Sequence, residues 1–266
     1  MPIDISASFD FALPAPTDCL LQFEAAVLPE QALLGADTRL SASEHFARVP
    51  AQDGIGERIW VRAEGAFHVE YTASVEVRRQ LPDLAPLAQL DPHLLPGETV
   101  EYLLSSAYCP VDRMYAFTEA EFGGTFGGAR VAAIRDWIAR HFAYEPGVSD
   151  ARTTALDSFV ERRGICRDYA HVLVTMARAS SIPARYAGVY APGVEPQDFH
   201  AVAEVFLADP GGIGGTWLPV DATGMAEPGE MVKIGVGRDA ADVSFLTCFS
   251  PCEFGNKQIA VTRSAG

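Results

Sequence analysis

Positive charge is scarce in this sequence: 20 Lys and Arg residues face 35 Asp and Glu residues, which gives a formal net charge of -15. An acidic surface repels phosphate and therefore argues against a nucleic-acid groove or an anionic membrane surface. No stretch reaches the roughly 18 uninterrupted apolar residues of a membrane-spanning helix. The first residues also lack the basic start and apolar run of a secretory signal. We therefore expect a cytoplasmic protein with no nucleic-acid or membrane partner.

Cysteine is also sparse and poorly spaced for a structural role. The chain has 5 cysteines, an odd number, without a CxxC pair, so neither a disulfide framework nor a zinc site is expected. Cys248 and Cys252 have no histidine nearby and are expected to be ordinary thiols, and Cys19 and Cys109 have no partner that the sequence identifies. No DxDxDG run indicates an EF-hand calcium loop. The sequence predicts no metal and no cofactor, and at least one free thiol needs an explanation.

Two halves of the chain differ in their hydrophobic period. In residues 1–80 apolar and polar side chains alternate, as in Ile5 to Phe11 and in AFHVEYTASVEV, which predicts an antiparallel, β-sandwich-like N-terminal domain. Residues 81–99 carry prolines at 82, 86, 92 and 96. Because proline breaks helices and removes a donor from a sheet, this segment is expected to be an extended connector.

Residues 100–266 are expected to form a second domain of helices followed by strands. Val131, Ile134 and Ile138 share a helical stripe, Thr154 and Asp157 predict the start of a second helix, and a third helix with a wide apolar arc begins near residue 164. Strands are expected in ARYAGVY, HAVAEVFL and TWLPVDAT. The fold class is therefore α+β, with a central helix packed on an antiparallel sheet.

Cys166 is the thiol with a candidate role. It stands at the expected start of the central helix, where unpaired backbone amides and the positive end of the helix dipole favour a thiolate. The backbone N–H of Cys166 could also donate to an oxyanion formed on an attacked carbonyl. A buried structural cysteine is the alternative interpretation. Asp168, in the first turn, is expected to support the start of the helix.

A predicted hairpin brings His200 and Asp221 together. The glycine-rich segment ADPGGIGG separates HAVAEVFL from TWLPVDAT, so the two strands should pair. Pairing Val202 with Pro219 would place His200 opposite Asp221, and a slip of two residues would leave them diagonal neighbours. An imidazole held by a carboxylate is a suitable base for a thiol.

These residues lie in three blocks that together resemble a known family. GICRDYAHVLVTMARASSIPARYAGVY, FHAVAEVFL and WLPVDATG are similar to the bacterial transglutaminase-like proteins of the papain-like cysteine protease superfamily, over roughly residues 100–250. The first eighty residues resemble, more loosely, the β-domain that precedes the core in many members. The resemblance implies a papain-like core and makes Cys166 the nucleophile, His200 the base and then the acid, and Asp221 the orienting carboxylate.

Three further positions follow from the resemblance. Tyr144 lies where the family often has an aromatic residue that assists the oxyanion or lines the cleft, although tyrosine there is as often part of a core. Val202 stands where the family usually has an aromatic residue, and Ala222 replaces the proline of Asp-Pro-Thr. Neither change removes a reacting atom, but the loss of the aromatic residue weakens inference of substrate from other members.

The sequence therefore predicts a Cys-His-Asp enzyme that opens amide bonds through an acyl-thioester. We expect a peptidase or amidase acting on a peptide or amide substrate, with water as the acceptor. The alternatives are a protein-glutamine transglutaminase, in which an amine takes the acyl group, and a non-catalytic binding module on the same fold. The sequence leaves a homo-oligomer open.

Overall fold

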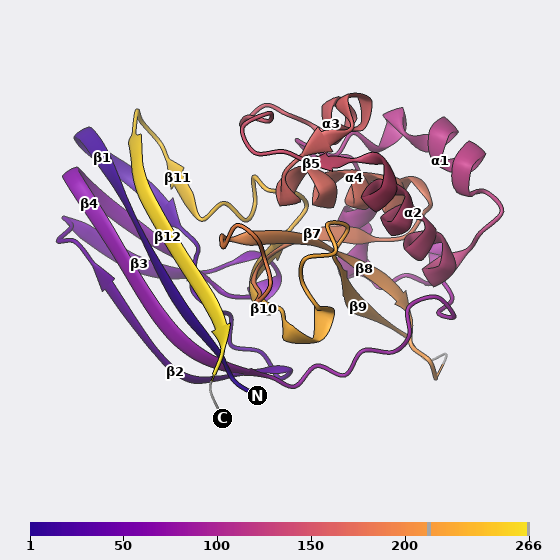
Figure 1. Ribbon diagram of the computed structural model, residues 1–266, viewed down its shortest axis with the longest axis horizontal. Helices are drawn as coiled ribbons and strands as arrows, with labels where there is room; N and C mark the ends of the chain where they lie inside the picture. The colour runs from indigo at the N-terminus through magenta and orange to yellow at the C-terminus, as the bar shows by residue number, and fades with distance from the viewer. Residues whose placement is uncertain (212–213, 265–266) are drawn as a thin grey trace.

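The computed structural model describes residues 1–211 and 214–264, in which two antiparallel sheets stand side by side (Figure 1). The larger sheet has six strands and the smaller has four within these ranges, and a pair of two-residue strands lies apart from both. The structure thus has the mixed, antiparallel α+β class that the sequence predicts. No helix in the described ranges is long and apolar enough to cross a membrane. The cytoplasmic location stays a prediction.

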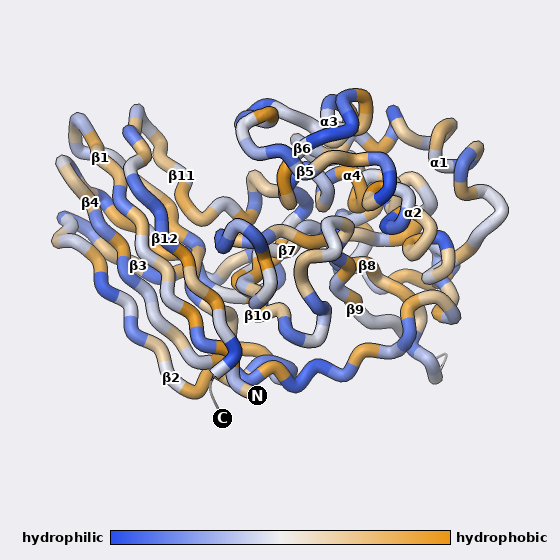
Figure 2. Tube along the Cα trace, in the orientation of Figure 1, coloured by the Kyte–Doolittle hydropathy of each residue, from blue (hydrophilic) through white to orange (hydrophobic). Residues whose placement is uncertain are grey.

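The larger sheet, here called the N-terminal sheet, confirms the alternation in the first eighty residues. Odd-numbered residues of β1 from Ile3 to Leu13 are buried, and Phe67 to Val75 of β4 follow the same period, which appears as alternating colours along the strands in Figure 2. Its strands are β1 Ile3–Leu21, β2 Gln31–Leu40, β3 His45–Pro50, β4 Glu57–Val77, β11 Leu246–Cys248 and β12 Glu253–Arg263.

The end of the chain differs from the predicted organisation. β11 and β12 pair antiparallel with β1, so residues 246–263 complete the N-terminal sheet, whereas the sequence predicts a second domain over all of residues 100–266. The chain thus leaves the N-terminal sheet through residues 81–99, which run beside the molecule without a strand (Figure 1), and later returns to it. The 3-10 helix η2 Pro92–Leu94 and the start of η3 Gly97–Leu103 lie within this connector.

Between the connector and β11 the chain forms a second part, here called the core, in which four helices cover a second sheet. The helices are α1 Tyr115–Phe122, α2 Gly127–His141, α3 Ala155–Glu161 and α4 Cys166–Ala179. The 3-10 helices η4 Val111–Arg113 and η5 Pro228–Glu230 also belong to this part, whereas η1 Gln52–Gly54 lies between β3 and β4. The strands are β5 Ala143–Tyr144, β6 Arg163–Gly164, β7 Ala184–Tyr190, β8 His200–Ala208, β9 Gly215–Val220 and β10 Val232–Gly237. The core sheet has the order β10-β7-β8-β9.

α4 is the central helix of the core, as its wide apolar arc predicts. All its residues from Cys166 to Arg178 except Arg167 are buried, and it packs on β7 and β8. Arg178 is buried too, and its guanidinium donates to the carbonyl oxygens of Ala184 at 2.8 Å and Leu104 at 2.9 Å. These bonds fix the far end of α4 and thereby hold its first residue in place.

One hydrophobic cluster connects the two sheets. Tyr190 on β7 and Val232 and Ile234 on β10 pack with the buried face of the N-terminal sheet. The Gln31 side chain adds polar contacts, because its amide donates to the Lys233 carbonyl at 2.9 Å and accepts from the Lys233 backbone N–H at 2.6 Å. The relative position of the sheets is therefore fixed by packing as well as by hydrogen bonds.

A buried ion cluster also stabilises the core sheet. Glu204 on β8 is 1% exposed and lies 2.8 Å from Arg185 and 2.6 Å from Lys233. Burial alone would raise the pKa of Glu204, but Lys233 and Arg185 outweigh it and lower the pKa to about 2. Removal of this carboxylate would take the fully buried partner from both cations and leave Arg185 with Asp53 at 2.8 Å and Lys233 with Glu30 at 3.6 Å.

Glu204→Gln is therefore expected to lower the free energy of unfolding by about 3–5 kcal/mol. Glu161→Gln is the matched control, because Glu161 pairs with Arg163 at 3.1 Å on the surface, where such a pair contributes about 1 kcal/mol or less. Urea unfolding followed by circular dichroism measures both variants. Equal effects of the two substitutions would contradict the structural role of the cluster.

Candidate active site

Cys166 is the first residue of α4 and is 8% exposed. Its N–H lies in the first helical turn, where backbone amides have no partner within the helix. Asp168 folds back over this turn and accepts a hydrogen bond from the Ile165 N–H at 2.9 Å. A Cβ at Gly164 would lie 2.6 Å from the Asp168 side chain, so glycine makes room for this contact. Asp168 thus supports the start of the helix, as the sequence predicts.

His200, the first residue of β8, is hydrogen-bonded to Asp221, which follows β9. The distance from His200 Nε2 to Asp221 Oδ2 is 3.0 Å, and both side chains are buried. The predicted register was wrong by two residues, because Pro219 pairs with Glu204 rather than with Val202. Since such a slip keeps each side chain on its face, the two residues meet as diagonal neighbours.

Asp221 is held as an anion by several donors. Its carboxylate accepts from the backbone N–H groups of Thr223 at 2.8 Å and Ala226 at 2.9 Å, besides His200. Burial would raise the pKa of Asp221, but the hydrogen bonds and the charge of His200 lower it. Burial would likewise lower the pKa of His200, but Asp221 and the Cys166 thiol outweigh it and raise the pKa to about 10. His200 therefore carries a proton near neutral pH.

The second nitrogen of His200 is available to Cys166. His200 Nδ1 is buried and has no hydrogen-bond partner among the described residues. The Cys166 thiol contributes directly to the raised pKa of His200, and Cys166 Sγ lies 4.0 Å from the carbonyl oxygen of Phe199, the residue before His200. The structure thus brings the three residues singled out in the sequence, Cys166, His200 and Asp221, to one place.

Tyr144, on β5, lies at the same place. β5 pairs with β6 so that Tyr144 is opposite Gly164, two residues before Cys166. Burial raises the pKa of Tyr144, and the nearby Cys166 thiol raises it further, so the hydroxyl keeps its proton. Its position next to Cys166 is compatible with donation to an oxyanion, and that role stays a prediction.

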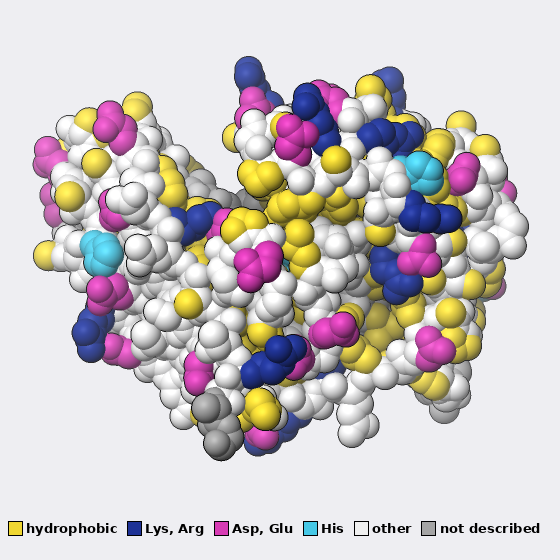
Figure 3. Space-filling model, viewed as in Figure 1, with side chains coloured by type: hydrophobic (Ala, Val, Ile, Leu, Met, Phe, Trp, Pro, Cys, Tyr) yellow, Lys and Arg dark blue, Asp and Glu magenta, His cyan; other side chains and the backbone are white. Residues whose placement is uncertain are grey.

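A cleft of about 700 Å³ opens in front of Cys166, between the N-terminal sheet and the core. The space-filling view shows a notch between the two parts of the molecule with hydrophobic side chains beside it (Figure 3). The wall of the cleft includes Tyr186 from β7, Phe245 from the segment before β11, and Gln22 at the end of β1. These residues could not be found from the sequence, because periodicity assigns them to strands and loops without showing that they converge.

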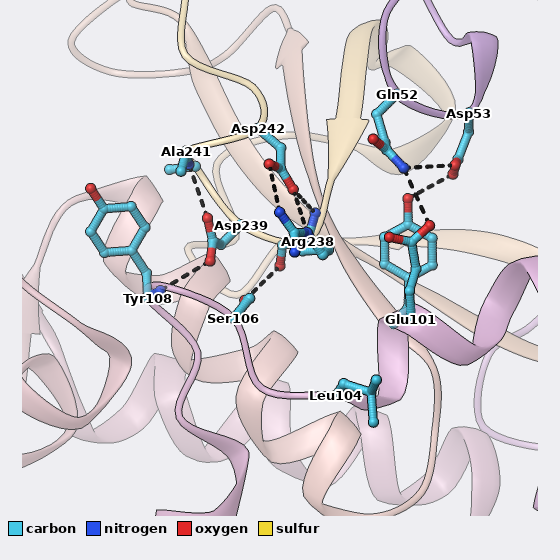
Figure 4. A network of polar contacts seen from close by, with 12 residues as sticks. Gln52, Asp53, Glu101, Leu104, Ser106, Tyr108, Arg238, Asp239, Ala241 and Asp242 are labelled. Atoms are coloured by element: carbon cyan, nitrogen blue, oxygen red, sulfur yellow. Dashed lines mark hydrogen bonds and ion pairs between the residues drawn. The ribbon is translucent and has the colours of Figure 1, made fainter.

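The loop after β10 forms one edge of the cleft. Asp239 is buried and accepts from the N–H groups of Tyr108 and Ala241, each at 3.0 Å (Figure 4). Beside it, Arg238 is paired with Asp242 at 2.9 Å. Arg238 and Asp239 therefore have a structural role, because they fix the backbone beside the active site.

His171 on α4 is a second buried histidine, and it supports this loop. Its ring stacks on Tyr108 with a centroid distance of 5.2 Å, and its Nε2 accepts from the Ala240 N–H at 3.1 Å. Because Nε2 is an acceptor, the ring is neutral and its proton is on Nδ1. Burial, with the charges of Arg167 and Arg178, lowers the pKa of His171 to about 3.

The neutral His171 makes the fold sensitive to acid. Since the ordinary pKa is about 6.5, the unfolded chain binds more protons than the folded protein between pH 6.5 and pH 3. The free energy of unfolding is expected to fall by about 1.4 kcal/mol per pH unit below 6.5 from this residue alone, or about 2 kcal/mol at pH 5. Urea unfolding at pH 6.5 and at pH 5 measures this loss of free energy. His171→Gln should reduce the pH dependence by that amount, and an unchanged dependence would refute the assignment.

The other four cysteines are different from Cys166. Cys109 is buried beside α4, with its Sγ 3.7 Å from the His171 carbonyl oxygen, and burial raises its pKa to about 11. Cys19 and Cys248 are opposite each other in the N-terminal sheet with their sulfur atoms 3.5 Å apart. Burial raises the pKa of Cys248 to about 11 and that of Cys252 to about 12. Among the described residues, no group of three or more His, Cys, Asp or Glu side chains is arranged to hold a metal ion.

A comparison with protein families matches part of the core. Residues 118–222 match the family model of the transglutaminase-like superfamily. The core is transglutaminase-like over these residues. The matched residues include Cys166, His200 and Asp221, so the site lies within the transglutaminase-like core rather than in the N-terminal sheet.

Two relatives extend this comparison. A crystal structure described as a "putative cysteine protease" from Cytophaga hutchinsonii is 29% identical and superposes with a TM-score of 0.88, covering 98% of this chain and 90% of that one. It therefore shares the N-terminal sheet as well as the transglutaminase-like core. An uncharacterised protein of Mycobacterium leprae is 29% identical over 157 residues, 55% of this chain and 53% of its own length. The match thus spans about half of that relative.

Proposed function

We propose that the protein is a cysteine-nucleophile acyl-transfer enzyme that hydrolyses amide bonds, as a peptidase or amidase. One observation carries the proposal: His200 has one nitrogen on Asp221 at 3.0 Å and its other nitrogen free beside Cys166. The likeness to a structure described as a "putative cysteine protease" supports the same reaction class. The substrate is a peptide or another amide that enters the cleft.

In the first half-reaction the Cys166 thiolate attacks the carbonyl carbon of the amide. The Cys166 N–H and the Tyr144 hydroxyl donate to the oxyanion. As the C–N bond breaks, the His200 imidazolium transfers its Nδ1 proton to the departing nitrogen, and an acyl-thioester remains on Cys166. Asp221 accepts from Nε2 throughout and keeps Nδ1 directed at the reacting atoms.

In the second half-reaction the neutral imidazole takes a proton from water as the water oxygen attacks the thioester. The C–S bond breaks, the carboxylic acid leaves, and the thiolate and imidazolium are restored. An amine in place of water would give a new amide, which is the transglutaminase alternative. Both outcomes use the same residues, so the acceptor distinguishes them.

Selective alkylation tests the nucleophile. Near neutral pH, iodoacetamide should label Cys166 at least about tenfold faster than the other four thiols, because it lines the cleft beside His200, whereas burial raises the pKa of Cys109, Cys248 and Cys252. Peptide mass spectrometry measures the labelling of each cysteine. Equal labelling of all five would refute the proposal and favour a non-catalytic module.

The acceptor needs a second experiment. The acyl-enzyme is trapped with a panel of amide and glutamine substrates, and its decay is followed by mass spectrometry with and without an added primary amine. For a hydrolase we expect a free carboxylic acid and no change in rate. Faster decay with an amide product would replace hydrolysis by amine transfer.

A further inference from the structure

Arg167 places a guanidinium with a free donor on the wall of the cleft. It follows Cys166 in the chain and lines the cleft, and 21% of its side chain is exposed. Its Nη2 donates to the Asp150 carbonyl at 2.6 Å and to Asp168 Oδ1 at 3.1 Å, and its Nε donates to the same carboxylate oxygen at 3.3 Å. Nη1 stays accessible and makes no hydrogen bond to any described residue. The guanidinium is therefore held in one orientation by two of its nitrogens, and the third can donate to a ligand.

The charge of Arg167 is not balanced from inside the cleft. Lys257 and Asp198, which also line the cleft, are paired with each other at 2.6 Å. The carboxylate that pairs with Arg167 belongs to Asp168, whose side chain is 0% exposed and does not line the cleft. A group that enters the cleft therefore meets the guanidinium without meeting its counter-ion. In a water-poor site such a cation attracts an anion more strongly than it would on an open surface.

Tyr186 on β7 supplies a second donor beside the nucleophile. Its side chain is 7% exposed, lines the cleft and packs in one buried cluster with Cys166. The hydroxyl makes no hydrogen bond to any described residue and is accessible from the cleft. Burial raises the pKa of Tyr186, the Cys166 thiol raises it further, and the charge of Arg167 lowers it. The hydroxyl thus keeps its proton and lies close enough to both neighbours to interact with them.

We propose that Arg167 Nη1 and the Tyr186 hydroxyl form an anion subsite, which selects substrates with a carboxylate close to the amide bond that Cys166 attacks. The inference rests on the proposed function and names its class of substrate. Consecutive Cα atoms are about 3.8 Å apart, so the guanidinium extends from the residue next to the nucleophile. Because other contacts already hold it, the guanidinium loses little conformational freedom when it binds a carboxylate. In a chain with a net charge of -15, this local contact distinguishes an anionic amide from a neutral one.

Two matched pairs of alkylating reagents test the subsite without requiring turnover. Iodoacetate and iodoacetamide differ in a carboxylate on the carbon that bonds to sulfur, and N-iodoacetylglycine and N-iodoacetylglycinamide carry the same difference farther from it. Peptide mass spectrometry measures the rate at which each reagent labels Cys166 in the wild type, Arg167→Gln and Tyr186→Phe. Arg163→Gln is the matched control, because Arg163 is three residues from Cys166, pairs with Glu161 at 3.1 Å on the surface and does not line the cleft.

The ratio of the acid rate to the amide rate within a pair is the readout, because it cancels any change in the reactivity of the thiol itself. In at least one pair, Arg167→Gln should lower this ratio by about tenfold to a hundredfold, and Tyr186→Phe, which removes one oxygen, by about threefold. Arg163→Gln should leave it within about twofold, because an exposed charge is screened.

Two results would overturn the inference: a ratio that is unchanged in both Arg167→Gln and Tyr186→Phe, or an equal fall in Arg163→Gln, which would indicate long-range charge alone. Tyr186→Phe decides the test by itself where Arg167→Gln does not fold. Failure of the proposed function is distinct from both results, because iodoacetamide would then label Cys166 no faster than the other thiols.

Discussion

Cys166→Ala is expected to lower kcat/KM for amide hydrolysis by at least about 10⁴-fold, because no other group at the site can form the acyl-thioester. The substitution removes one sulfur atom from a side chain that is 8% exposed, so the fold should change little. A fluorogenic peptide amide measures the loss, and mass spectrometry of the quenched reaction shows whether an acyl-enzyme still forms.

Cys252→Ala is the matched control for this prediction. Cys252 is partly buried near the N-terminal sheet and does not line the cleft, so its loss should leave hydrolysis within about twofold of the wild type. Activity that survives in Cys166→Ala, or that disappears equally in both variants, would show that the thiol of Cys166 is not the nucleophile.

The pairing of His200 with Asp221 could be predicted from the sequence, but the register of the strands could not. Alternation identifies the face of a strand, and a slip of two residues preserves that face. The register depends on the length and conformation of the turn, which alternation does not report. The prediction of the pair was therefore robust, whereas the predicted pairing of Val202 with Pro219 was wrong, since Pro219 is opposite Glu204.

A different reason explains why the C-terminal strands β11 and β12 were not predicted. β12 has only Ile259 and Val261 buried among its eleven residues, so its hydrophobic alternation is weak. Its partner is β1, at the opposite end of the chain, and a contact of such long range leaves no local pattern. The same applies to Gln22 and Phe245, which reach the cleft only because the N-terminal sheet docks on the core.

Asp221→Asn is expected to lower kcat/KM by about 10²- to 10⁴-fold while leaving Cys166 in place. Both oxygens of Asp221 accept from N–H groups: Oδ2 from His200 and Ala226, and Oδ1 from Thr223. An amide NH₂ at either position therefore faces another donor. If the NH₂ group faces His200, Nε2 must accept a hydrogen bond, and the imidazole proton is then held on Nδ1. Nδ1 can then no longer act as a base toward the reacting atoms.

The substitution also removes the negative charge that favours the imidazolium. Since Asp221 contributes to the raised pKa of His200, the pKa should fall, and the high-pH limit of amide hydrolysis should move to lower pH. Asp239→Asn is the control, because Asp239 is equally buried and accepts from Tyr108 and Ala241 without contacting His200. A pH profile of kcat/KM measures both variants. If the two asparagine variants lose activity equally and their profiles do not shift, Asp221 supports only the fold, and the orientation of His200 must come from the packing around its ring.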